Sequence, residues 1–294
     1  MHKVGIIGAG WVGTACEIGF SSMPHTEVMV HDKYKPTDSL RTVVSNSNIL
    51  FVCVPTPMRE DGSCDTSIVH ESVRQIAQCS RTPKAIVIKS TVSPGTTNTL
   101  QLNNPSHRIF FNPEFLTEKD FITDFCNQEL IILGQPEAAK NHDRFFLENF
   151  YNDFIRHQKK EKGRVFWVNS TTAEMIKYTA NCFLATKVSF FNEIYEICNQ
   201  IGADYNALIN VLKNDKRIGS THLQVPGPDG QFGFGKSCFP KDIQALIALC
   251  RKEGVDPLVL ESVWAKNLMV REVHDWEKLP QVNGNYINSK KEAS

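Results

Sequence analysis

The sequence predicts an α/β protein in which a doubly wound parallel sheet is followed by an all-helical domain. Short apolar segments alternate with helix-length segments up to Asn169, which is the pattern of a parallel sheet with helices on both faces. Beyond that residue, helix-length segments follow one another without strands. A chain of 294 residues is also long enough for two domains. We therefore predict a sheet domain at residues 1–169, a helical domain at 170–282 and a disordered polar tail at 283–294.

The first apolar segment leads directly into a glycine-rich turn with the pattern G-x-G-x-x-G. The turn consists of Gly8, Ala9, Gly10, Trp11, Val12 and Gly13, and a helix-length segment follows it. This order is typical of a Rossmann-type unit, in which the helix N-terminus holds the pyrophosphate of a dinucleotide. A tight turn that binds no nucleotide is the less favoured alternative.

The second apolar segment ends in Asp32. A carboxylate at this place accepts hydrogen bonds from the adenosine ribose and repels the 2′-phosphate of NADP. Lys33 and Lys35 weaken that discrimination, because cations beside the ribose also suit a phosphate. We predict NAD as the cofactor.

Polar residues follow the ends of several predicted strands. The seven strand segments are 3–7, 27–31, 49–54, 85–88, 108–111, 130–133 and 165–168. A helix capped by Asp65 lies between the third and the fourth. Ligands of such sheets bind at the carboxyl ends of the strands, where Thr56, Ser90, Thr91 and the segment 112–118 stand. Singly each is more often a turn or cap residue, but together they predict a ligand site.

A segment without Gly or Pro, residues 171–201, predicts one long helix, opened by Thr171 and Glu174 as a capping box. Lys177 and Asn181 lie one turn apart on its otherwise small or apolar stripe, so both side chains can reach one ligand. The alternative has equal weight: a packing face from which Lys177 extends to solvent.

Cys238 precedes a helix whose first position we assign to Pro240, because proline needs no N–H there. The helix dipole and Lys241 would stabilise the thiolate, and Asp242, one turn on, would offer a proton acceptor. The glycines of the preceding Gly-Phe-Gly would let the backbone approach a ligand. This setting favours a reactive cysteine over a buried structural one.

The composition excludes several other classes of protein. Lys and Arg number 32 and Asp and Glu also 32, so no overall charge attracts nucleic acid or an anionic membrane. No apolar run approaches the ~20 residues of a membrane span, and the chain enters a strand where a signal peptide would stand. The nine cysteines show no C-x-x-C, which argues against a disulfide framework or a metal site. We expect a cytoplasmic protein.

Together these motifs resemble the UDP-glucose 6-dehydrogenase family of nucleotide-sugar dehydrogenases, over residues 3–271. The matching segments are the glycine-rich turn, 54–57, 90–92, 112–116, Glu174 with Lys177 and Asn181, 217–219 and 233–242. The resemblance implies oxidation of a sugar C6 alcohol to a carboxylate with two NAD⁺ and one water. UDP-glucose is the substrate that it favours, and the long helix would pair two copies of the chain.

The resemblance also implies roles for single residues. Asp242 and Lys177 would remove the alcohol proton, and Cys238 would capture the aldehyde as a thiohemiacetal, which a second oxidation turns into a thioester. Lys177 and Asn181 would stabilise oxyanions at C6. Glu114, with a water positioned by Thr91, would be the base for thioester hydrolysis.

Further residues would bind the two ligands. Those implied for NAD are Gly8, Gly10, Trp11, Val12, Gly13, Asp32, Thr56, Thr91, Glu118 and Lys241. Those implied for the nucleotide-sugar are Glu114, Phe115, Leu116, Lys177, Asn181, Arg217, Phe234 and Gly235. The charge of Arg217 suits a diphosphate across the dimer interface.

The chain departs from the family pattern at Lys236, where a second glycine is usual. It also stops before the second α/β domain that covers the UDP in family members. A dehydrogenase for another nucleotide-sugar and an NAD-binding dimeric scaffold without turnover are the alternatives. The β-hydroxyacid dehydrogenases share the dinucleotide domain but need no cysteine, so Cys238 argues against them.

Overall fold

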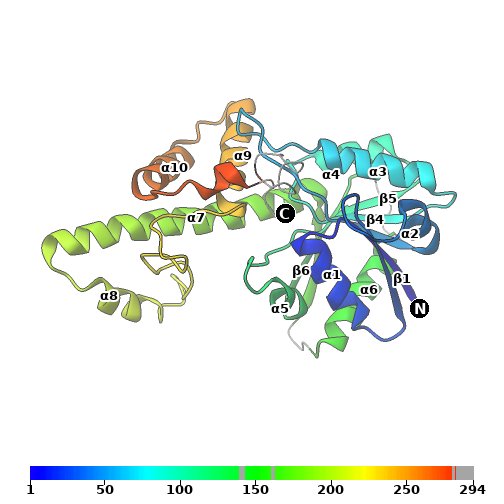
Figure 1. Cartoon of the computed structure of the whole chain (residues 1–294), viewed down its shortest axis with the longest axis horizontal. Coiled ribbons are helices and arrows are strands. Elements are labelled where there is room, and N and C mark those ends of the chain that lie inside the picture. The colour runs from blue at the N-terminus through cyan, green and yellow to red at the C-terminus, as the bar shows by residue number, and fades with distance from the viewer. Residues whose placement is uncertain (139–142, 160–162, 280–281, 283–294) are drawn as a thin grey trace. The chain divides into compact units, whose positions relative to one another are not determined.

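The computed structural model describes residues 1–138, 143–159, 163–279 and 282 (Figure 1). The chain forms two compact units. The first comprises Met1–Thr56 and Asp65–Lys177, and the second comprises Pro57–Cys64 and the chain from Tyr178 onward. The predicted domain boundary after Asn169 falls at the start of the long helix, whereas the two units divide within that helix. The tail predicted to be disordered, 283–294, lies outside the described residues.

The first unit is built on a seven-stranded sheet with the order β2-β1-β3-β4-β5-β6-β7. Its strands are β1 (His2–Ile7), β2 (Thr26–His31), β3 (Ile49–Val52), β4 (Ala85–Ile88), β5 (Arg108–Phe111), β6 (Leu130–Gln135) and β7 (Arg164–Asn169). All seven predicted strands are confirmed. The prediction of a wholly parallel sheet is wrong at one place, because β5 and β6 pair antiparallel. Antiparallel neighbours need no long crossover, and only the short helix α5 (Phe121–Cys126) joins these two strands.

Helices cover both faces of this sheet, as the alternation of segments predicts (Figure 1). Apolar side chains of α1 (Trp11–Ser21), α5 and α6 (Asp143–His157) pack on one face. Those of α2 (Leu40–Asn46), α3 (Ser67–Cys79) and α4 (Thr96–Asn103) pack on the other. Successive side chains of a strand point to opposite faces, so Phe51 of β3 joins the first core while Leu50 and Val52 join the second.

The second unit contains the greater part of α7 (Ser170–Ile201), together with α8 (Tyr205–Leu212), α9 (Cys238–Lys252), α10 (Leu258–Val270) and the 3₁₀-helix η1 (Asp275–Lys278). Asp204 caps α8 by accepting from the N–H of Ala207. Helix α10 ends at Val270, because Arg271 leaves the helical conformation with ψ 116°.

The predicted capping box at the start of α7 is wrong. The amide oxygen of Asn169 accepts from the N–H of Thr172 at 2.7 Å and so caps the helix. Glu174 instead accepts hydrogen bonds from the segment that opens α4. The stripe predicted for α7 is its buried face: Glu174, Lys177, Asn181 and Asn192 are all less than a tenth exposed.

Candidate active site

The glycine-rich turn joins β1 to α1, and its geometry requires a glycine where it meets the helix. A Cβ at Gly13 would lie 1.8 Å from the carbonyl oxygen of Gly8, far inside van der Waals contact. A Cβ at Gly10 would have nothing within 4 Å, so this side of the turn is open beside the start of α1. The first N–H groups of a helix have no partner within it and favour an anion. The turn therefore fits a dinucleotide pyrophosphate.

Asp32 follows β2 and directs its carboxylate at this turn. Its Oδ2 accepts from the N–H of Ala9 and its Oδ1 from that of Tyr34, both at 2.8 Å. Each carboxylate oxygen has a further lone pair, which leaves capacity to accept from ribose hydroxyls. The ammonium of Lys35 donates to the carbonyl oxygen of Ala9, so this lysine is held on the turn. The carboxylate fits the ribose of NAD.

Glu114 and Lys177 form a buried ion pair within the first unit. Lys177 Nζ lies 2.9 Å from Glu114 Oε1 and also donates to the Glu114 carbonyl oxygen at 2.7 Å. The N–H of Leu116 donates to the other carboxylate oxygen. Burial by itself raises the pKa of Glu114, but Lys177, this N–H and Lys89 together bring it below its ordinary value. Glu114 is therefore ionised at neutral pH, as a general base must be.

A second buried cation, Lys89, supports this pair and is absent from the sequence-based site. Its Nζ donates to Asn112 Oδ1 at 2.6 Å, and the hydroxyl of Tyr151 donates to the same oxygen at 2.6 Å. The Asn112 amide donates in turn to the carbonyl oxygen of Ile132. These bonds fix the strand end that leads into Glu114. A lysine at the end of the apolar segment 85–88 is the signal in the sequence that points to it.

Glu174 connects α7 to the N-terminus of α4. Its carboxylate accepts from the N–H of Gly95 at 2.6 Å and from the N–H and hydroxyl of Thr97 at 2.8 and 2.6 Å. Burial outweighs these bonds and raises the pKa of Glu174 to about 7. Glu174 therefore anchors the N-terminal part of α7, the helix on which Lys177 stands.

Cys238 is the first residue of α9, so the helix begins two residues earlier than predicted. Pro240 stands inside the first turn, where a missing N–H costs nothing because the first N–H groups of a helix have no partner within it. The prediction of a cysteine at a helix N-terminus, with Lys241 and Asp242 in the following turn, is confirmed.

Asp242 is the centre of a buried polar cluster in the second unit. Its side chain is 1% exposed, its Oδ2 accepts from Asn181 Nδ2 at 2.5 Å, and the Lys241 ammonium is bonded to its Oδ1. Burial lowers the pKa of Lys241, but Asp242, with smaller contributions from Cys64 and Cys238, raises it above its ordinary value. The structure thus brings Asn181, Lys241 and Asp242 together at the turn that Cys238 opens.

The other predicted site residues have varied surroundings. Thr56 and Phe234 are buried, whereas Trp11 is 48% exposed. Phe115 is 38% exposed, with Lys177 Nζ 5.5 Å from its ring centroid. The residues that are partly buried are Val12, Thr91, Leu116 and Glu118. Arg217 is 89% exposed and paired with Asp215 at 2.6 Å, so it is available to a ligand from solvent. The ligand contacts assigned to these residues stay predictions.

Lys236 has a left-handed backbone conformation, with φ +60°. That conformation costs an L-residue other than glycine roughly 1–2 kcal/mol. Glycine adopts this conformation without that cost, so it would suit this position better than lysine. Lys236 is therefore a strained residue directly beside the Cys238 turn.

Replacing Lys236 by glycine is expected to stabilise the chain. The gain should be about 0.5–1 kcal/mol, because relief of the left-handed strain exceeds the entropy that glycine loses on folding. Urea unfolding of the two proteins measures this difference. Lys236→Ala is the matched control, since it removes the side chain but keeps the strain. A Lys236→Gly protein no more stable than Lys236→Ala would contradict the assignment.

Two family models match most of the chain. Residues 26–155 match the NAD binding domain of the UDP-glucose/GDP-mannose dehydrogenase family, and residues 171–268 match its central domain. The chain belongs to this family. Asp32 lies in the matched NAD binding part, the glycine-rich turn precedes that part in the same sheet domain, and NAD is the cofactor. Among the described residues, no group of three His, Cys, Asp or Glu side chains is placed to hold a metal ion.

Named relatives and solved structures agree with this membership. A UDP-glucose 6-dehydrogenase of Rickettsia bellii is 34% identical over 82% of this chain and 54% of its own length. One of Rhizobium meliloti is 31% identical over 90% of this chain and 67% of its own length. The structure of a UDP-glucose dehydrogenase from Pyrobaculum islandicum matches with a TM-score of 0.78 at 26% identity, over 92% of this chain and 68% of that one.

This chain matches only part of each of these relatives. It spans about half the length of the first curated relatives that it matches. Along the part of the chain that the structure describes, each helix is too short or too polar to cross a membrane.

Proposed function

We propose that this chain catalyses the NAD-dependent oxidation of the C6 alcohol of a nucleotide-sugar, UDP-glucose first, to the carboxylate. The observation that carries the proposal is the polar cluster at Cys238, in which Asn181 and Lys241 hold the buried carboxylate of Asp242 one turn away. A nucleophile with an oriented acid–base group is the arrangement that covalent catalysis requires. The named relatives supply the substrate class.

The proposed reaction converts R–CH₂OH, two NAD⁺ and one water into R–COO⁻, two NADH and three protons. Bound NAD⁺ supplies the acceptor for the two electrons and the hydrogen that leave C6 in each oxidation. The alcohol proton goes to Asp242, whose carboxylate is oriented by Asn181 and Lys241. Charge that develops on the C6 oxygen is stabilised by the Asn181 amide and the Lys177 ammonium.

Cys238 retains the aldehyde between the two oxidations. Its sulfur adds to the C6 carbonyl and the oxygen takes a proton, which gives a thiohemiacetal that still carries one hydrogen on C6. Loss of that hydrogen leaves a thioester. Glu114, ionised and buried beside Lys177, takes a proton from the attacking water, and the carbon–sulfur bond breaks to release the carboxylate and the thiol.

The experiment that tests this function is NADH formation by the purified chain with NAD⁺ and UDP-glucose, beside GDP-mannose as a second nucleotide-sugar. UDP-glucose is expected to give NADH at the higher kcat/KM. NADH from GDP-mannose alone would assign another nucleotide-sugar. NAD binding without NADH from either sugar would favour the scaffold alternative.

A homodimer through α7 is part of the same proposal. Four large apolar side chains of this helix are nearly half or more exposed: Phe183, Phe190, Ile197 and Ile201 are 65%, 56%, 47% and 73% exposed. Their spacing of seven, seven and four residues places them on one stripe. A stripe along one helix can pair with itself about a two-fold axis, so a second copy of this chain is its natural partner.

Replacing Phe190 by glutamate is expected to convert a dimer into a monomer. Two carboxylates would face each other near the symmetry axis in an apolar interface, which is unfavourable. Sedimentation equilibrium at micromolar concentration measures the change. Val211→Glu on α8, where the replaced side chain is 72% exposed but off the stripe, should leave the dimer intact. A monomeric unmodified chain, or a Phe190→Glu dimer, would contradict the interface.

A further inference from the structure

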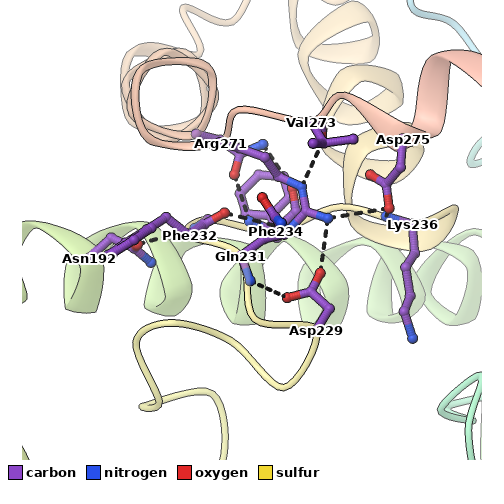
Figure 2. Close-up of polar contacts among 11 residues, drawn as sticks. Asn192, Asp229, Gln231, Phe232, Phe234, Lys236, Arg271, Val273 and Asp275 are labelled. Carbon is purple, nitrogen blue, oxygen red and sulfur yellow. Dashed lines mark hydrogen bonds and ion pairs between the residues drawn. The ribbon is translucent and has the colours of Figure 1, made fainter.

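The backbone that leads to Cys238 is held by buried polar side chains from two helices (Figure 2). Asn192 of α7 accepts from the N–H of Gly233 at 3.1 Å. Asn267 of α10 accepts from the N–H of Phe234 at 2.7 Å and donates to its carbonyl oxygen at 3.0 Å. One amide side chain thus satisfies both backbone groups of Phe234, as a neighbouring strand would.

Arg271, the residue that ends α10, lies at the centre of this network (Figure 2). Its side chain is only 2% exposed. The guanidinium donates to the carboxylates of Asp229 and Asp275 at 2.9 and 3.2 Å, and to the carbonyl oxygen of Val273 at 3.1 Å. A longer contact of 3.5 Å reaches the carbonyl oxygen of Phe232. Only a planar group with several fixed N–H donors can serve these acceptors together.

Asp275 connects Arg271 to the turn that precedes Cys238. Its Oδ2, which Arg271 binds, also accepts from the N–H of Lys236 at 3.1 Å. Lys236 stands two residues before Cys238, so a short chain of bonds joins the guanidinium to the start of α9. Breaking the bond at Arg271 would leave a partly buried carboxylate without its cation, which is costly.

The two glycines of the Gly-Phe-Gly segment make room for this network. A Cβ at Gly233 would lie 2.3 Å from Asn267 Oδ1, and one at Gly235 would lie 2.2 Å from Arg271 Nη2. The sequence predicts that these glycines allow the backbone to approach a ligand closely. In the structure, the side of each glycine where a Cβ would stand is filled by the protein's own polar groups. The network therefore requires glycine at both positions, and the left-handed backbone of Gly233, with φ +67°, favours glycine there as well.

We propose that Arg271 is a positioning residue for Cys238: through Asp275 and the backbone of residues 232–236 it fixes where the thiol stands at the start of α9. The inference rests on the proposed function of Cys238 as the nucleophile. A displacement of about 1 Å at a reacting group can cost roughly 10²-fold in rate, so loss of the guanidinium should be visible in kcat. The NAD turn lies in the other unit, and its affinity for NAD should not change.

The test compares Arg271→Lys with the unmodified chain. Lysine keeps the positive charge beside Asp229 and Asp275 but has only one nitrogen with three donors, so it cannot replace the guanidinium. Arg251→Lys is the matched control, because Arg251 is 62% exposed and paired with Glu261 in the same unit. Amide hydrogen exchange of residues 232–236, iodoacetamide alkylation of Cys238, NADH turnover and NAD affinity are measured for all three proteins.

For Arg271→Lys we expect at least tenfold faster exchange at residues 232–236, with exchange in the interior of α9 unchanged. The alkylation rate of Cys238 should change at least threefold, kcat should fall roughly 10- to 100-fold, and NAD affinity should stay within about twofold. Arg251→Lys should match the unmodified chain in every measurement. Unchanged exchange and unchanged alkylation in Arg271→Lys would overturn the proposal. If the unmodified chain forms no NADH, the proposed function fails separately, and exchange and alkylation still decide the role of Arg271.

Discussion

Replacing Cys238 by serine is expected to reduce formation of the carboxylate, and of the second NADH, by roughly three orders of magnitude or more. A serine hydroxyl does not ionise at neutral pH, and it lacks the nucleophilicity with which a thiol retains the aldehyde. The variant should therefore form neither the thiohemiacetal nor the thioester. Groups that act as one catalytic unit lose most of their effect when any member is removed, which is why the loss should be this large.

Cys250→Ser is the matched control for this variant. Cys250 stands on the same helix, partly buried beside the apolar core of the second unit. It should retain activity within about twofold, because a conservative change away from the reacting atoms removes no catalytic group. The NADH and carboxylate formed per sugar are measured for both proteins. Carboxylate formation by Cys238→Ser, close to that of Cys250→Ser, would mean that the second oxidation proceeds without a bond to sulfur.

Replacing Lys177 by methionine is expected to destabilise the first unit and to abolish most activity. Methionine nearly matches the length of lysine but leaves the buried Glu114 carboxylate without its strongest partner. Removing one member of a buried pair costs about 3 kcal/mol or more, and kcat should fall about 10²- to 10³-fold because the C6 oxygen loses a cation. Urea unfolding and NADH turnover measure the two effects.

The stability loss of Lys177→Met should depend on pH in a defined direction. In the unmodified chain the pKa of Glu114 lies below its ordinary value, so its stabilising contribution is present above about pH 4.5 and is lost as pH falls further. In the variant, burial without Lys177 raises the pKa of Glu114. The variant should therefore be weakest at pH 8 and recover towards pH 5, where the carboxyl group takes up a proton. A deficit that is constant from pH 5 to pH 8 would contradict this account.

A double variant separates stability from chemistry. Glu114→Gln combined with Lys177→Met removes the unpaired charge, so most of the stability should return while activity stays lost. Arg74→Met serves as the control for an exposed pair, because Arg74 and Glu71 lie 2.7 Å apart on the surface of α3. It should change stability little, since solvent screens such pairs.

The sequence predicts the sheet because local patterns determine it. Each of the seven strands contains a short, mainly apolar segment, and the glycine-rich turn and Asp32 carry their signals in residue types at fixed spacings. The antiparallel pairing of β5 with β6 has no such signal. It depends on how a short connection places one strand beside another, which residue patterns do not encode.

The residues of the candidate site also fall into two groups, those with a local signal in the sequence and those placed by contacts between distant segments. Cys238, Asp242 and Lys177 stand in short motifs, whereas Lys89 and Arg271 act through contacts between segments distant in sequence. Glu174 shows the difficulty: its spacing from Thr171 fits a local capping box, yet its carboxylate binds Gly95 and Thr97. The Glu174 carboxylate binds the N-terminus of α4 instead of the start of its own helix, and only the folded structure reveals this choice.

The number of NADH molecules formed per UDP-glucose consumed tests the central claim most directly. The purified chain is incubated with excess NAD⁺ until a limiting amount of sugar is exhausted, and NADH and sugar acid are both quantified. Oxidation through a Cys238 thioester predicts two NADH and one carboxylate for each sugar. One NADH with accumulated aldehyde, or no NADH at all, would contradict the four-electron mechanism.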